Sequence, residues 1–92
     1  MGQFRIKIEP KAKTEISKHF KSGNKATIRK IEKFLLELSI HPFSGEGKPE
    51  MLKFQLSGFW SRRINKEHRL VYRVEEIEEI VYVLSAWGHY EI

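Results

Sequence analysis

The side chains of this chain that could do chemistry lie mostly in its second half. Glu50 follows the stretch Gly47-Lys48-Pro49 and comes directly before a strand-like pattern. A carboxylate at such a loop–strand junction can act as a general base if a substrate proton comes within about 3 Å. The alternative is a solvated surface glutamate that pairs loosely with Lys48 or Lys53, and position alone favours that alternative.

A pair of arginines forms the second candidate. The alternation of residues 59–64 places Arg62 and Arg63 on opposite faces of a strand, and Arg69 begins the next strand-like segment across a tight turn. Arg69 can therefore share a face with Arg63. Two guanidinium groups on one exposed face suit a phosphate, because arginine is always charged and binds phosphate in a bidentate manner. Alternatively, these arginines pair with Glu67, Glu75 or Glu76 as ordinary surface charges.

The third candidate is the tail, Trp87-Gly88-His89-Tyr90. Histidine titrates near neutral pH, so His89 beside the hydroxyl of Tyr90 could donate a proton to a leaving group. Trp87 and Tyr90 also offer faces on which unstacked bases could lie. The alternative, which the tail alone favours, is a terminal strand whose histidine and aromatic side chains only pack.

Taken together, these groups are the ones that metal-free RNA cleavage requires. A glutamate would take the proton from a ribose 2′-OH, which then attacks the adjacent phosphate. Cations would hold the charge that builds on that phosphate, and a histidine would protonate the departing 5′-oxygen. Because the nucleophile is the 2′-OH, such a site would cut RNA and spare DNA, leaving a 2′,3′-cyclic phosphate and a 5′-hydroxyl.

The composition argues against metal and thiol chemistry. The chain has no cysteine and no aspartate, which excludes disulfides, thiol nucleophiles and cysteine-based metal sites. His19, His41 and His68 do not stand at ligand spacing, so neither a metal site nor a cofactor is expected. His68 is expected to be a turn residue.

The hydrophobic pattern predicts the elements that must position these groups. Residues 4–8 alternate as a half-buried strand. Helices are expected over 10–22, with Pro10 in the first turn, and over 25–39, with Asn24 as the N-cap. Strands are expected over 52–56, 59–64, 68–74 and 80–87. The predicted buried stripes are Ala12, Ile16 and Phe20 on the first helix, and Ile28, Ile31, Leu35 and Leu38 on the second.

This order predicts one α+β domain over residues 1–92, in which two N-terminal helices pack on a twisted antiparallel sheet in the order β-α-α-β-β-β-β. The net charge of +5 favours an anionic partner, namely nucleic acid, an acidic protein segment or a membrane surface. No stretch approaches the roughly 18 apolar residues of a membrane span, and the N-terminus does not resemble a signal peptide. A cytoplasmic protein without a membrane partner is therefore expected.

Three sequence runs resemble a known family. They are residues 45–50 (GEGKPE), 56–64 (LSGFWSRRI) and 67–72 (EHRLVY), followed by His89-Tyr90 near the end. They are similar to the Txe/YoeB toxins, which belong to the RelE/ParE superfamily of bacterial type II toxin–antitoxin systems. The resemblance covers residues from about Ile28 to Tyr90.

The resemblance implies a RelE-like fold of the microbial RNase type and an endoribonuclease, or mRNA interferase, that inhibits translation by cutting mRNA in the ribosomal A site. It implies three catalytic residues: Glu50 as general base, Arg69 as the arginine that stabilises the transition state, and His89 as general acid. The supporting contacts to phosphate and substrate match Lys53, Arg63 and Tyr90.

The resemblance also implies partners. A cognate antitoxin of the YefM/Axe type is expected to silence the toxin, and the complex of the two is expected to bind operator DNA; a homodimer is also allowed. Ten Lys and Arg residues but only three Glu lie in residues 1–33. The ribosome and its mRNA are the expected target. The basic surface of the second helix is expected to contact ribosomal RNA through Lys25, Arg29 and Lys33.

Two other classes of function remain open from the sequence. One is a non-catalytic basic module that binds RNA or ribosomes through phosphate contacts alone. The other is a protein-interaction subunit whose basic helices dock an acidic partner.

Overall fold

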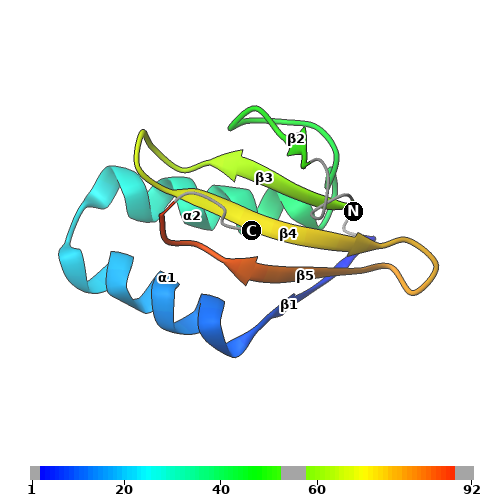
Figure 1. Ribbon diagram of the computed structural model, residues 1–92, viewed down its shortest axis with the longest axis horizontal. Helices are drawn as coiled ribbons and strands as arrows, with labels where there is room; N and C mark the ends of the chain where they lie inside the picture. Colours follow the sequence, from blue (N-terminus) through cyan, green and yellow to red (C-terminus); the bar gives the residue numbers. More distant parts are fainter. Residues whose placement is uncertain (1–2, 53–57, 89–92) are drawn as a thin grey trace.

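The computed structural model describes residues 3–52 and 58–88, and these form two helices and a five-stranded sheet. The elements follow the predicted order (Figure 1). Their bounds are β1 Arg5–Ile8, α1 Pro10–Ser22, α2 Lys25–Leu38, β2 Glu50–Met51, β3 Phe59–Arg63, β4 Arg69–Glu75 and β5 Ile80–Ser85.

The sheet is mixed and not wholly antiparallel as predicted. Its strand order is β1-β5-β4-β3-β2, and the pairs from β2 to β5 are antiparallel. β1 lies at the edge and runs parallel to β5, with Ile6 opposite Val81. No hairpin joins these two strands, because β1 leads into α1, so local turn chemistry did not fix its direction.

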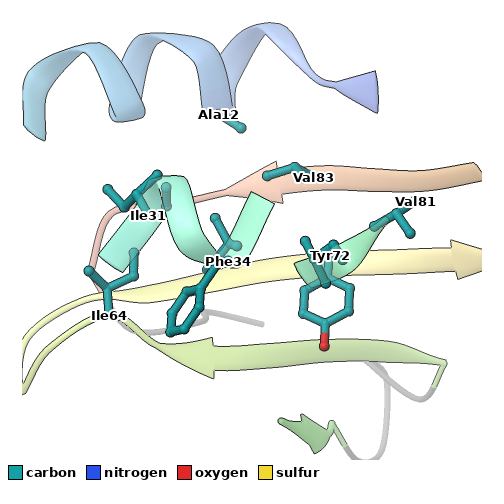
Figure 2. Packing of buried hydrophobic residues seen from close by; sticks show 10 residues of the cluster. Ala12, Ile31, Phe34, Ile64, Tyr72, Val81 and Val83 are labelled. Carbon is teal, nitrogen blue, oxygen red and sulfur yellow. The ribbon is translucent and has the colours of Figure 1, made fainter. Parts of the chain in front are cut away.

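Both helices pack on one face of the sheet. Ala12 of α1 and Phe34 of α2 belong to the same buried cluster as Tyr72 of β4 and Val83 of β5. Figure 2 shows these side chains gathered between the helices and the strands. The opposite sheet face carries no helix among the described residues, which leaves it open.

The helix ends agree with the predicted caps. Pro10 occupies the first turn of α1, which ends at Gly23 with a left-handed φ of 76°. The side chain of Asn24 accepts a hydrogen bond of 3.1 Å from the backbone N–H of Thr27, as an N-cap residue does.

The buried helix faces differ in part from the predicted stripes. On α2, Phe34 is fully buried while Ile28 and Leu35 are only half-buried. On α1, Phe20 is 44% exposed and the adjacent His19 is buried in its place. His19 is accommodated because its ring Nε2 lies 2.7 Å from the carbonyl oxygen of Ala86.

Two predicted strands also have different bounds. β2 is a two-residue strand, Glu50–Met51, and the predicted strand 52–56 lies largely outside the described residues. β5 ends at Ser85, two residues before the predicted end. Within the described part of the chain, neither helix has the length and hydrophobicity that a membrane crossing requires.

Candidate functional site

Glu50, Arg63 and Arg69 lie together on the open face of the sheet. Arg63 of β3 is paired directly with Arg69 of β4, as the alternation predicted. Glu50 of the edge strand β2 is paired with Ser61, two residues before Arg63 on the same face of β3. The three side chains line one cavity of about 210 Å³, together with Ser61 and the loop residues Lys48 and Pro49.

Arg63 and Arg69 line this cavity, and no carboxylate among the described residues pairs with either of them. Among the described residues, neither Arg63 nor Arg69 forms an ion pair, whereas Arg73 lies 3.0 Å from Glu75. The alternative in which Glu67, Glu75 and Glu76 neutralise the arginine pair is therefore not seen in this part of the chain. A carboxylate and two such cations are suited to a phosphate ester beside a hydroxyl group that must lose its proton to attack it.

Backbone contacts fix the position of Arg69. Its guanidinium Nη1 donates to the carbonyl oxygens of Asn65 (3.1 Å) and His68 (3.3 Å). The Asn65 side chain in turn accepts hydrogen bonds of 2.9 Å from the N–H groups of Glu67 and His68, which closes the turn. Arg69 is thus oriented by the β3–β4 turn before any ligand arrives.

The C-terminal segment is attached to the same turn. The backbone N–H of Gly88 donates to Nδ1 of His68 at 2.7 Å, and the Gly88 carbonyl accepts from the backbone N–H of Arg69 at 2.9 Å. Gly88 directly precedes His89 in the sequence. The predicted residues Lys53, His89 and Tyr90 themselves lie outside the described residues.

Two histidines that stand far apart in the sequence meet beside this segment. The rings of His19 and His68 are 4.7 Å apart, and Trp87 packs on both, at 4.7 and 4.4 Å between ring centroids. His68 is therefore a half-buried packing residue rather than only a turn residue. In the part of the chain that the structure describes, no cluster of three or more His, Cys, Asp or Glu side chains could hold a metal ion.

The sequence pattern predicts no functional role for Arg62, yet this residue organises the loop that leads to Glu50. Its side chain is fully buried, and it forms an ion pair of 2.7 Å with Glu37 of α2. Its Nη2 donates to the backbone carbonyls of His41 (2.5 Å) and Ser44 (2.7 Å) in the loop, and Nη1, which pairs with Glu37, also donates to the Glu46 carbonyl (3.4 Å). The loop backbone is therefore held from beneath by one guanidinium.

Tyr72 completes this anchor. Its hydroxyl accepts from Nε of Arg62 at 3.3 Å and donates to the carbonyl of Pro42 at 2.7 Å. Burial raises the pKa of the Tyr72 hydroxyl, although the hydrogen bond from Arg62 opposes that rise. The sequence did hold a signal for this anchor: alternation places Arg62 between Trp60 and Ile64, on the face that the helices cover.

The same loop approaches α2 too closely for a side chain at Gly47. A Cβ there would stand 2.4 Å from the ring of Phe34, and the residue has a φ of 87°. The Gly47 carbonyl accepts from the backbone N–H of Arg63 at 2.7 Å. The glycine thus lets the loop pass between α2 and β3 and brings Glu50 beside the arginine pair.

The basic residues of α2 differ in whether a nearby carboxylate neutralises their charge. Lys33 lies 2.5 Å and Lys30 lies 3.0 Å from the carboxylate of Glu46. These contacts lower the pKa of Glu46, and they raise that of Lys33. Lys25 and Arg29 are exposed and form no ion pair with a described residue. Their predicted contact with ribosomal RNA stays a prediction.

The sequence matches a protein family described as YoeB-like toxin of bacterial type II toxin-antitoxin system, over residues 11–90. The chain belongs to this family. Toxin YoeB of Synechocystis sp. is 42% identical over 82 residues, which cover 85% of this chain and 93% of that relative.

Solved structures of YoeB toxins share the fold. A YoeB dimer from Staphylococcus aureus has a TM-score of 0.79 and 37% identity, over 96% of this chain and 99% of that one. A YoeB-YefM complex from Staphylococcus aureus has a TM-score of 0.77 and 39% identity, over 95% of this chain and 98% of that one. The predicted RelE-like α+β fold is therefore confirmed, with the mixed sheet as its correction.

Proposed function

We propose that this toxin is an endoribonuclease that cleaves mRNA in the ribosomal A site by metal-independent acid–base chemistry, and so inhibits translation. The observation that carries the proposal is the convergence of Glu50, Arg63 and Arg69 in one cavity on the open sheet face. Membership of a toxin family supports it.

Glu50 acts as the general base in this proposal. Its carboxylate takes the proton of the ribose 2′-OH, and the 2′-oxygen forms a bond to the adjacent phosphorus. Arg69, oriented by the β3–β4 turn, and Arg63, opposite it in the sheet, hold the charge that builds on the phosphoryl oxygens. The Arg69 guanidinium is oriented before the substrate binds, which favours the transition state.

The bond from phosphorus to the 5′-oxygen then breaks, and His89 protonates the departing oxygen. The products are a 2′,3′-cyclic phosphate and a 5′-hydroxyl. Lys53 and Tyr90 are proposed to add substrate contacts. The attachment of Gly88 to both His68 and Arg69 supports a place for His89 near this phosphate, because His89 is the next residue along the chain.

The proposed partners follow from the family. The S. aureus YoeB-YefM complex supports a YefM/Axe-type antitoxin that silences this toxin, and the S. aureus YoeB dimer supports a homodimer. We further propose that the complex of toxin and antitoxin binds operator DNA, and that the basic face of α2 contacts the ribosome. A substrate on the ribosome places the toxin in the cytoplasm.

Primer extension on a reporter mRNA in pre-assembled ribosome complexes tests the proposal. Wild-type protein should cut within the A-site codon, and Glu50→Gln should lower the cleavage rate by about 10²- to 10⁴-fold, because a general base contributes about that much. Glu78→Gln is the matched control, since Glu78 is an exposed glutamate in the turn between β4 and β5.

Three outcomes separate the alternatives. Wild-type protein that binds ribosomes without cutting would favour the non-catalytic RNA-binding module and overturn the proposal. Equal cleavage by wild type and Glu50→Gln would remove Glu50 as the base. Cleavage by both wild type and Glu78→Gln, with loss in Glu50→Gln, is the predicted result.

A further inference from the structure

A second cavity adjoins the candidate active site. It has a volume of about 450 Å³, and Lys48, Arg63 and Arg69 line it as well as the smaller cavity that holds Glu50. From these shared residues it extends toward Lys30 of α2 and Lys66 of the β3–β4 turn. The two cavities therefore adjoin each other at these three residues, and Glu50 lines only the smaller one.

The charge of the larger cavity is one-sided. Of the described residues, five with cationic side chains line it and none with a carboxylate does. Lys30 is partly neutralised by Glu46 at 3.0 Å, but the other four form no ion pair with any described residue. Cations gathered without a counter-charge repel one another, so an anion that enters this space is bound favourably.

Hydrogen bonds within the β3–β4 turn and to α2 hold one wall of the larger cavity. Asn65, in its wall, holds the turn through two hydrogen bonds from backbone N–H groups and donates from its amide to Thr27 of α2 at 3.4 Å. On the other side, Lys48 has a φ of 52°, a left-handed conformation that non-glycine residues seldom adopt. Such backbone strain is often kept where a side chain must point in a set direction at a functional site.

We propose that the larger cavity is a subsite for the RNA backbone, which holds the phosphate and ribose of the nucleotide next to the cleaved bond. This inference rests on the proposed function and deepens it. The scissile phosphate lies at Arg63 and Arg69, where the cavities meet, and the flanking phosphate lies between Lys30 and Lys66. The volume is in the range of about 300–1,000 Å³ that is usual for ligand sites.

Among the described residues, the larger cavity extends from the arginine pair in one direction, toward Lys30 and Lys66. The subsite therefore fixes the direction in which the RNA strand crosses the sheet. It also reads the charge of the backbone and not the identity of the base.

The test is a double-mutant cycle between protein and substrate. Ribosome complexes are prepared with three mRNAs: unmodified, with an uncharged methylphosphonate at the phosphate 5′ of the cut, and with one at the phosphate 3′ of it. Single-turnover cleavage at subsaturating toxin is measured for wild type, Lys66→Ala and the control Lys13→Ala. Lys13 is exposed on α1 and does not line either cavity.

We expect one of the two methylphosphonates to slow the wild type by about tenfold, roughly the contribution of one charge-assisted hydrogen bond. Lys66→Ala should slow cleavage of unmodified mRNA by a similar factor and be insensitive to that same modification, because the contact is already lost. Lys13→Ala should behave as the wild type on all three mRNAs.

One result would contradict the subsite, and another would contradict the proposed function. If the effects of Lys66→Ala and of both methylphosphonates simply multiply, the subsite is absent while the ribonuclease proposal stands. If wild-type protein cuts none of the three mRNAs, the proposed function itself fails. The two failures are therefore distinguishable.

Discussion

Arg62 and Arg63 are neighbours in β3, yet the fold uses them in opposite ways. The side chain of Arg62 points toward the helices and is fully buried, where Glu37, the hydroxyl of Tyr72 and three loop carbonyls accept its hydrogen bonds. The side chain of Arg63 is exposed on the open face, lines both cavities and has no ion pair among the described residues.

The difference shows how one strand can serve structure and chemistry at once. Successive side chains of a strand point to opposite faces, so two identical residues meet different surroundings. A guanidinium whose donors already bind protein acceptors holds the loop before Glu50 in place. A guanidinium without such partners keeps its charge for a ligand.

The largest effect should follow from removing the buried guanidinium. Arg62→Met removes the guanidinium donor of the Glu37 carboxylate and of several loop carbonyls. Breaking a buried ion pair costs about 3–5 kcal/mol, and we expect the lower end because the Glu37 side chain is 22% exposed and still accepts from the backbone N–H of Glu46. Urea denaturation should show a much lower midpoint for Arg62→Met than for wild type. Arg63→Met, with the same change one residue later, should stay within about 0.5 kcal/mol of wild type. Equal losses in both variants would contradict the division between the two arginines.

The exposed guanidinium should matter for activity instead. In the proposed mechanism Arg63→Met removes a donor that holds the developing phosphate charge, so cleavage on ribosomes should fall by about 10²- to 10³-fold. Arg5→Met is the control, because Arg5 is an exposed arginine of β1 at the far edge of the sheet. If Arg63→Met cleaved as fast as Arg5→Met, Arg63 would be a surface charge without a role at the phosphate.

The smallest expected effect is a pH dependence of the unfolding free energy that comes from the Tyr72 hydroxyl. Burial raises the pKa of Tyr72, so above its ordinary value of 10.0 the folded state keeps a proton that the unfolded state loses. This contribution to stability is complete below pH 10 and declines as the pH rises toward the folded-state pKa. Tyr72→Phe lacks that dependence. The difference in unfolding free energy between wild type and Tyr72→Phe should therefore shrink from pH 9 to pH 11, and a constant difference would contradict this explanation.

Sequence patterns predicted most helices and strands well, because these elements depend on residues that are neighbours in the sequence. The alternation of residues 4–8, the N-cap at Asn24 and the opposite faces of Arg62 and Arg63 depend on neighbours in the sequence, and all are confirmed. The direction of β1 depends on its pairing with β5 at the other end of the chain, and it was predicted wrongly.

The candidate site was predictable to a similar extent. Pairing of Arg63 with Arg69 follows from the alternation and the short turn, while the place of Glu50 depends on a loop held by Arg62 from beneath. Alternation places Arg62 on the face that the helices cover, but its partners in α2 and the loop are far apart from it in sequence, as His19 is from His68, so spacing could not reveal these contacts. The roles of Lys53, His89 and Tyr90 stay predictions from the family resemblance.

The central claim is that Glu50 and the arginine pair direct a ribose 2′-OH against the adjacent phosphate. The most direct measurement places a single 2′-deoxynucleotide at the mapped cut site of an mRNA in a pre-assembled ribosome complex, beside the unmodified mRNA. The account predicts that wild-type protein cuts the unmodified strand to a 2′,3′-cyclic phosphate and leaves the 2′-deoxy strand intact at that bond. Cleavage of the 2′-deoxy strand at an undiminished rate would contradict it.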